Sequence, residues 1–189
     1  SVGWAWGAMM SRYARWARHE HSEAARITVL TLLAGPIILG LLPFLVAVAG
    51  PRVDRRLGLP RPGIGTVIRL LGGLLTVLGF SVGFWSVHAQ VTRGRGTPLP
   101  VMPTQELLTE GPFRHCRNPM TLGTILAYLG MAVAARTISG MVLVLAVAAS
   151  LVTYLKCLEE RELAERFGDA YLAYKRETPF LVPRLPGWR

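Results

Sequence analysis

The chain has 189 residues, of which 51% are hydrophobic and only 17% are charged, and its formal net charge is +10. Its length fits one domain, and its apolar residues gather into long blocks, which excludes an ordinary soluble globular protein. Because the basic residues lie between these blocks, anionic lipid headgroups and topology signals explain the charge better than nucleic acid does. Cys116 and Cys157 show neither a disulfide framework nor metal-ligand spacing, so we expect free thiols and no metal site.

Residues 1–26 precede the first apolar block. Tryptophan, methionine and tyrosine side chains recur in this segment at helical spacing, whereas arginines lie off that stripe. The pattern predicts an amphipathic helix lying in the membrane interface, with its aromatic rings at the depth of the lipid headgroups. A partly ordered tail is the alternative.

Four apolar blocks follow, at residues 27–49, 64–89, 120–135 and 137–157. The first is uncharged and long enough to cross a hydrocarbon core of about 30 Å. Only Arg136 and its neighbours separate the last two, which predicts a tight helical hairpin. The sequence therefore predicts an all-α integral membrane bundle of about four transmembrane helices, formed by residues 27–157 and working as one functional domain.

Two features inside the apolar blocks bear on helix geometry and packing. Pro36 and Pro43 are expected to kink the first helix, because proline lacks a backbone N–H. The second block contains glycines at intervals that permit close contact between helices, at Gly72, Gly73, Gly79 and Gly83.

Four spans place the N-terminus, the polar segment 90–119 and residues 158–189 on one side of the membrane. That side holds most of the basic residues, which predicts that it is cytosolic. The segment 50–63, read as a loop, is an exception to this tendency, because it contains Arg52, Arg55, Arg56 and Arg61. Either the basic residues elsewhere determine the orientation in spite of this segment, or the first block does not cross the membrane fully. The excess of Arg over Lys is typical of a GC-rich bacterial genome, so the expected location is a bacterial inner membrane with the active site facing the cytosol.

Residues 158–189 are predicted to form a cytosolic amphipathic helix that continues out of the last span, followed by a tail. Leu163, Phe167 and Tyr171 recur every four residues, and charged side chains occupy the other faces. Prolines from Pro179 onward end the regular structure.

A knot of polar side chains leads into the third block, at Arg114, His115, Arg117 and Asn118. Glu159 and Glu160 directly follow the fourth block. If the last two blocks form a hairpin, both groups come to the same end of the bundle, over an apolar cleft that suits a ligand of mixed charge. The alternatives are headgroup contacts for the arginines, an interfacial role for His115 and a solvated helix face for the glutamates.

Longer stretches around these groups resemble a known family. The segment GPFRHCRNPMTLG, residues 111–123, resembles the Arg-His/Asn-Pro segment of the isoprenylcysteine carboxyl methyltransferase and phospholipid methyltransferase superfamily. The segment EERELAERFGDAYLAYKRETPFLVP, residues 159–183, is similar to that family's C-terminal pattern of a Glu pair, a Phe-Gly step, spaced tyrosines and prolines. GRGTPLP, residues 94–100, resembles the Gly-rich segment of bacterial members. The resemblance covers residues 94–183, with matching order and spacing.

The resemblance implies a small all-helical membrane enzyme that uses S-adenosylmethionine. It places cofactor contacts on Arg117, Asn118, Pro119, Glu159 and Glu160, and on Gly94 and Gly96 of the Gly-rich segment. Arg117 would pair with the cofactor carboxylate, and a glutamate would accept from its ammonium or ribose. Two departures matter, because Asn118 stands where many relatives have His, which argues against a general base there, and Thr121 replaces the usual Tyr.

The implied reaction is methyl transfer to a lipophilic or membrane-embedded acceptor, as in O-methylation of an isoprenylcysteine carboxylate or a related O-, N- or S-methylation. Further catalytic candidates are His115, as a base for an amine acceptor, and Arg114 and Arg176, as anchors for an anionic acceptor. The expected partners are this acceptor and membrane lipids. The acceptor atom and the oligomeric state stay open.

Two other classes of function fit parts of the pattern. A sterol-reductase-like membrane enzyme has a similar Arg-His-Pro segment and would bind NADPH, but the short chain and the Glu-pair tail weigh against it. A non-catalytic membrane protein would keep the scaffold as a binding module, which the departures at Asn118 and Thr121 allow.

Overall fold

The computed structural model describes residues 22–29, 31–32, 35–62, 65–95, 97 and 104–183. Most of the predicted interfacial helix of residues 1–26 lies outside these residues; α2 (Glu23–Val29) includes only its last positions. The described residues form helices, turns and irregular segments, with no β-strand among them. The all-α prediction is therefore confirmed.

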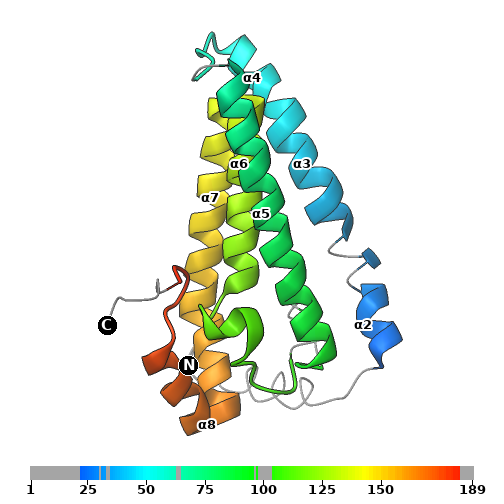
Figure 1. The fold of residues 1–189 in the computed structure, drawn as a ribbon, viewed down its shortest axis with the longest axis vertical. Coiled ribbons are helices and arrows are strands. Elements are labelled where there is room, and N and C mark those ends of the chain that lie inside the picture. Colours follow the sequence, from blue (N-terminus) through cyan, green and yellow to red (C-terminus); the bar gives the residue numbers. More distant parts are fainter. Residues whose placement is uncertain are drawn as a thin grey trace, which may run out of the picture.

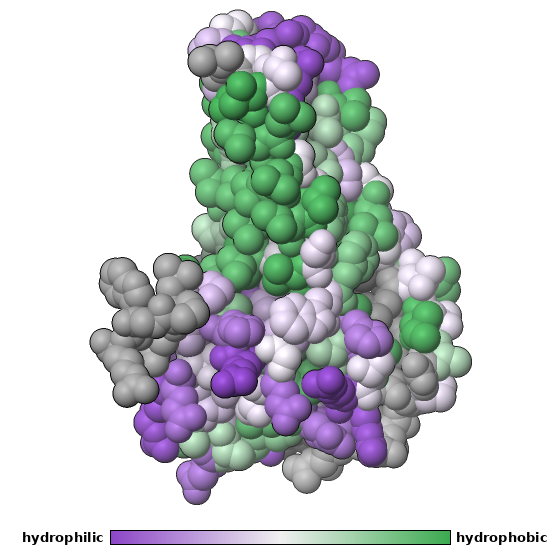
Figure 2. All heavy atoms as spheres, viewed as in Figure 1, coloured by the Kyte–Doolittle hydropathy of each residue, from purple (hydrophilic) through white to green (hydrophobic). Residues whose placement is uncertain are grey.

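Three helices are long and apolar enough to cross a membrane, namely Pro36–Arg56, α5 (Gly65–Thr92) and Ile138–Glu177. The fourth apolar helix, α6 (Pro119–Ala135), has 17 residues and is shorter. Figure 1 shows the apolar helices side by side, and Figure 2 shows a hydrophobic band over them with hydrophilic surface at both ends. Exposed leucines and valines along the band, such as Leu70 and Val142, are suited to contact lipid.

The first apolar helix combines four segments, η2 (Pro36–Leu41), α3 (Leu42–Phe44), η3 (Leu45–Ala49) and α4 (Gly50–Arg56). Two of them, η2 and η3, are π-helical and lie next to Pro36 and Pro43. Because a proline offers no N–H to the helical ladder, wider turns accommodate it. Residues 50–56 are helical, so the prediction of a loop over 50–63 is wrong for its first half.

The helices α5 and α6 pack with their backbones almost in contact. A Cβ added at Gly72 would lie 2.4 Å from the Ala134 nitrogen, and one at Gly79 would lie 2.2 Å from the Ala127 nitrogen. A Cβ at Gly73 would meet nothing within 4 Å. The predicted close contact is therefore confirmed at Gly72 and Gly79, and the pairing runs antiparallel.

The helices α6 and α7 (Ile138–Tyr154) form the predicted hairpin, with a turn of two residues. Arg136 adopts the left-handed conformation (φ 54°) that closes α6. The Thr137 side chain accepts a hydrogen bond from the Gly140 nitrogen (3.1 Å) and caps α7. Asp54 on α4 accepts from the nitrogens of Ile138 and Ser139, both at 2.9 Å, and so ties the first helix to this turn.

From α7 the helix continues through η5 (Leu155–Glu159) into α8 (Glu160–Glu177), as predicted. The predicted amphipathic helix is interrupted at Gly168, whose backbone adopts φ 53° and ψ −131°. That conformation favours glycine, which lacks the Cβ that would clash. Beyond the break, Tyr171 and Tyr174 are buried.

The polar knot before α6 and the arginine-rich residues 52–61 lie at opposite ends of the bundle. The helix α2, the segment leading into α6, and α8 gather at one end (Figure 1), which agrees with the predicted sharing of one side. The helix Pro36–Arg56 runs to the other end, so the arginine-rich residues 52–61 lie far from the polar knot.

Candidate active site

A short irregular segment delivers Arg117 and Asn118 to the start of α6. The 3-10 helix η4 (Gly111–Arg114) begins at Gly111, whose positive φ of 59° glycine tolerates, and buries Phe113. The Tyr174 hydroxyl donates to the Phe113 carbonyl at 2.6 Å. The Arg117 nitrogen donates to the Pro179 carbonyl at 2.9 Å. The segment before α6 is therefore fixed to the residues at and beyond the end of α8.

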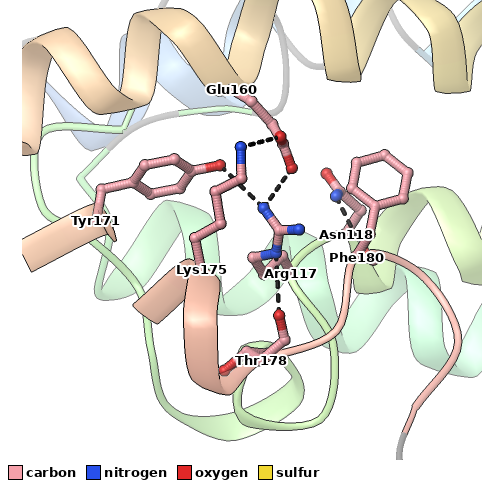
Figure 3. Close-up of polar contacts among 7 residues, drawn as sticks. All are labelled: Arg117, Asn118, Glu160, Tyr171, Lys175, Thr178 and Phe180. Atoms are coloured by element: carbon pink, nitrogen blue, oxygen red, sulfur yellow. Dashed lines mark hydrogen bonds and ion pairs between the residues drawn. The ribbon is translucent and has the colours of Figure 1, made fainter. Parts of the chain in front are cut away.

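The Arg117 guanidinium is the centre of the site (Figure 3). Its Nη1 forms an ion pair with Glu160 and lies 3.3 Å from the Tyr171 hydroxyl, and its Nε donates to the Thr178 carbonyl at 3.1 Å. The second carboxylate oxygen of Glu160 pairs with Lys175 at 2.6 Å. The side chains of Arg117 and Glu160 are only 11% and 13% exposed, so the pair is poorly screened by water. Arg117 Nη2 has no hydrogen-bond partner among the described residues and is free for a ligand.

Asn118 is the N-cap residue of α6, but its side chain does not cap the helix. Its Nδ2 instead donates to the Phe180 carbonyl at 3.0 Å. The Phe180 ring lies 5.6 Å from the Arg117 guanidinium carbon and 5.0 Å from Lys156 Nζ, so two cations face one ring. Pro119, fully buried, occupies the first turn of α6. Asn118 thus binds the C-terminal segment to the site.

Glu159 differs from its neighbour, although both follow the apolar part of the same helix. It has no hydrogen bond or ion pair with the described residues. Burial, together with the negative charges of Glu162 and Glu160, raises the pKa of Glu159 to about 7. The predicted pair therefore divides into one carboxylate held by Arg117 and Lys175 and one that is available.

The remaining predicted residues do not join this cluster. Arg114, His115 and Arg176 are exposed and bond no described side chain. Gly96 lies outside the described residues. Gly94 lies in the described part, where its carbonyl accepts from the Gln105 nitrogen at 2.7 Å and Gln90, Leu108 and Thr104 crowd its Cα. Cys116 is buried, which raises the pKa of its thiol, and both cysteines are free as expected.

Sequence reasoning missed the residues that complete the cluster, namely Lys156, Tyr171, Lys175, Thr178 and Phe180. Tyr171 was recognised only as part of an apolar stripe. The glycine at position 168 was the signal in the sequence that could have indicated them, because the helix breaks there and the end of α8 turns back towards Arg117. Backbone carbonyls at positions 178 to 180 have no signature in a sequence at all.

An apolar cavity of about 280 Å³ lies beside this end of the bundle. Its walls come from η2, α5 and the first turn of α6, and include Ile38, Phe80, Phe84, Met120 and Thr124. Met120 and Thr124 follow Asn118 and Pro119 directly along α6, so the cavity and the polar cluster share the start of one helix. A polar, charge-paired cluster at the membrane edge and an apolar cavity within the bilayer-facing part meet there.

The fold and the site define an integral membrane protein of the all-helical class, with a charged cluster at one end of its apolar helices. The phospholipid methyltransferase family matches residues 67–170, which are 104 of the 189 residues, and the chain belongs to that family. The matched region contains Arg117, Asn118 and both glutamates.

A curated relative supports the family assignment. Over 73 residues the chain is 38% identical to methanethiol S-methyltransferase 2 of Bradyrhizobium diazoefficiens. The match covers 39% of this chain and 27% of that protein, so the chain spans about a quarter of the relative's length. No solved structure matches the chain.

Proposed function

We propose that the protein transfers a methyl group from S-adenosylmethionine to a lipophilic acceptor that enters from the bilayer. The observation that carries this proposal is the largely buried ion pair of Arg117 with Glu160, next to Asn118, Pro119 and Glu159 in the chain, inside the region that the phospholipid methyltransferase family matches. Bound there, S-adenosylmethionine would supply a methyl group activated by its sulfonium.

The polar groups left free at the site fit the amino-acid end of this cofactor. Glu159 is a carboxylate without a partner among the described residues, and it suits the ammonium group. Arg117 Nη2 is a free charge-assisted donor, and it suits the carboxylate. Glu160 is already occupied by Arg117 and Lys175, so its role is to position the guanidinium. This assignment sharpens the sequence prediction, which left open which of the two glutamates accepts from the ammonium or the ribose.

The apolar cavity supports the lipophilic nature of the acceptor. Its volume of about 280 Å³ is at the lower end for small-molecule sites, so it suits a short apolar molecule or the reactive end of a longer one. Phe80 and Phe84 would hold the apolar part, and the protein would contribute mainly by orienting the acceptor towards the methyl group. A carboxylate or thiolate acceptor needs no base, whereas an amine needs one.

Ligand titration tests the cofactor. Purified full-length protein in neutral detergent is titrated with S-adenosylhomocysteine and, separately, with NADPH, and heat of binding is recorded. Binding of S-adenosylhomocysteine alone supports methyl transfer. Binding of NADPH alone favours the reductase alternative, and binding of neither favours a non-catalytic protein.

A second candidate acceptor is a small thiol, which the name of the Bradyrhizobium relative favours. Its methylation breaks the sulfonium–methyl bond, forms a thioether and releases the thiol proton. Protein incubated with methyl-labelled S-adenosylmethionine is offered methanethiol or extracted bacterial lipid. Label in a volatile product indicates the thiol, and label in the lipid extract indicates the lipid.

A further inference from the structure

At the end of the bundle opposite Arg117, a cavity of about 150 Å³ has an unusual concentration of arginine. Arg55 comes from α4, Arg61 from the following turn, Arg69 from the start of α5 and Arg136 from the turn after α6. Four separate segments therefore direct guanidinium-bearing residues to one hollow. This region also contains the basic loop that runs against the expected charge distribution across the membrane.

The acidic residue of this cavity does not neutralise its arginines by direct pairing. Asp54 is 5% exposed, and its two carboxylate oxygens accept from the Ile138 and Ser139 nitrogens at the start of α7. Asp54 is thus committed to capping a helix. The four arginines and one carboxylate leave a formal excess of positive charge in the cavity.

One arginine fixes the wall of the cavity and three are available. Arg136 Nε donates to the Pro62 carbonyl at 2.9 Å, and its Nη2 donates to the Arg61 carbonyl at 3.3 Å, so Arg136 holds the turn in place. Arg55, Arg61 and Arg69 are exposed, and their side chains have no hydrogen bond or ion pair with the described residues. Their donors are free to bind an anion.

The chemistry and the surroundings favour a phosphate group. Guanidinium groups bind phosphate through paired N–H donors, and a hollow of this size holds a headgroup phosphate but not a whole lipid. Further along α5, the exposed side chains of Leu70 and Leu74 contribute to the apolar surface of the hydrophobic band. Acyl chains attached to a bound phosphate would lie along that surface.

We propose that the cavity of Arg55, Arg61, Arg69 and Arg136 is a binding site for the phosphate of an anionic phospholipid, at the membrane face opposite the methyltransferase site. The positive charge that runs against the expected distribution across the membrane then has a binding role. The inference stands on this cavity alone and is independent of the proposed methyl transfer.

The test compares two pairs of substitutions in the full-length protein in neutral detergent. The pocket pair is Arg55→Gln with Arg69→Gln. The control pair is Arg52→Gln with Arg56→Gln, which removes the same charge from α4 at the same end of the bundle but not from the cavity. Retained phosphatidylglycerol is measured by native mass spectrometry, with phosphatidylcholine and inorganic phosphate as separate probes. An unchanged helical circular dichroism spectrum establishes that each variant is folded.

The expected result is that the pocket pair binds phosphatidylglycerol at least about tenfold more weakly than the unsubstituted protein, whereas the control pair retains its affinity. Inorganic phosphate should compete with the lipid, and phosphatidylcholine should bind more weakly. Equal losses in both pairs would show attraction by net charge alone and overturn the proposal. Binding of inorganic phosphate without binding of phosphatidylglycerol would overturn the proposal that the bound phosphate belongs to a lipid.

Discussion

Arg117 and Glu160 form an ion pair that joins the start of α6 to the start of α8, across 43 positions of sequence. Both side chains are largely withdrawn from water, and each has further partners, Thr178 and Tyr171 for Arg117 and Lys175 for Glu160. The pair thus fixes the geometry in which Glu159 is left free. From the sequence Glu160 is predicted to contact the ligand, whereas in the structure it supports its neighbours by pairing with Arg117 and Lys175.

Replacing Glu160 and Glu159 separately by glutamine should distinguish the glutamate that holds Arg117 in place from the glutamate that is available to a ligand. Glu160→Gln leaves the buried Arg117 charge without its carboxylate and should lower the free energy of unfolding by about 3 kcal/mol. Glu159→Gln removes a carboxylate that has no partner and should not lower it near neutral pH. Thermal unfolding in detergent measures both. Equal destabilisation by the two substitutions would contradict this division.

Cofactor affinity should depend on Glu159 and Arg117 but not on Arg55. Under the proposed function, Glu159→Gln removes the group that faces the cofactor ammonium and should weaken S-adenosylhomocysteine binding by about tenfold or more. Arg117→Ala should weaken it as well, whereas Arg55→Ala, at the opposite end of the bundle, should not. Calorimetric titration of the folded variants provides the affinities, and equal affinities in all of them would refute the placement of the site.

The raised pKa of Glu159 predicts that the stability of the folded protein falls as pH rises. In the folded protein this carboxyl keeps its proton up to about pH 7, whereas in the unfolded chain it loses its proton near 4.5, the ordinary pKa of a glutamate. The folded state therefore binds more protons between these values, and the contribution of Glu159 to stability is lost as pH rises through that window. Relative to Glu159→Gln, the unsubstituted protein should lose on the order of 2–3 kcal/mol between about pH 5 and about pH 8. Parallel stability curves for the two proteins would contradict the shift.

Neighbouring glycines on α5 provide a matched test of helix packing. Gly72→Ala would place a Cβ against the α6 backbone at Ala134 and Gly130, where rigid atoms must move, at a cost of about 1–3 kcal/mol. Gly73→Ala would place it in open space and should be neutral or stabilising, because alanine favours helix more than glycine does. Thermal unfolding of both variants checks this. A similar loss in both would show that helix contact is not what requires Gly72.

Filling the apolar cavity should affect the acceptor and not the cofactor. Gly83 lines the cavity and has open space at its Cβ, so Gly83→Leu would occupy part of the volume. The expected result is a higher KM for a lipophilic acceptor, by about tenfold, with unchanged S-adenosylhomocysteine affinity. Gly73→Leu adds the same side chain to the same helix away from the cavity and serves as the control. An unchanged KM in Gly83→Leu would place the acceptor elsewhere.

Much of this architecture could be predicted because it follows from patterns along the chain. Long uncharged blocks require helices in a bilayer, since no water is present to satisfy the backbone. The short Arg136–Thr137 interval allows only a tight hairpin, and that hairpin alone brings Arg117 and the glutamates to one end. The glycines of α5 likewise indicated close packing, and the structure selects Gly72 and Gly79 as the contacts.

Tertiary structure alone decided which polar groups satisfy one another. Arg117 pairs with Glu160 and donates to the Thr178 carbonyl, which lies beyond the break at Gly168, whereas Glu159 has no partner among the described residues. Likewise, four arginines scattered over residues 55–136 become one cavity only when three helix ends and a turn meet. Sequence patterns determine which segments are buried in the membrane, because burial is a property of each segment. Partners across dozens of residues depend on distance and side-chain direction, which only the packed chain defines.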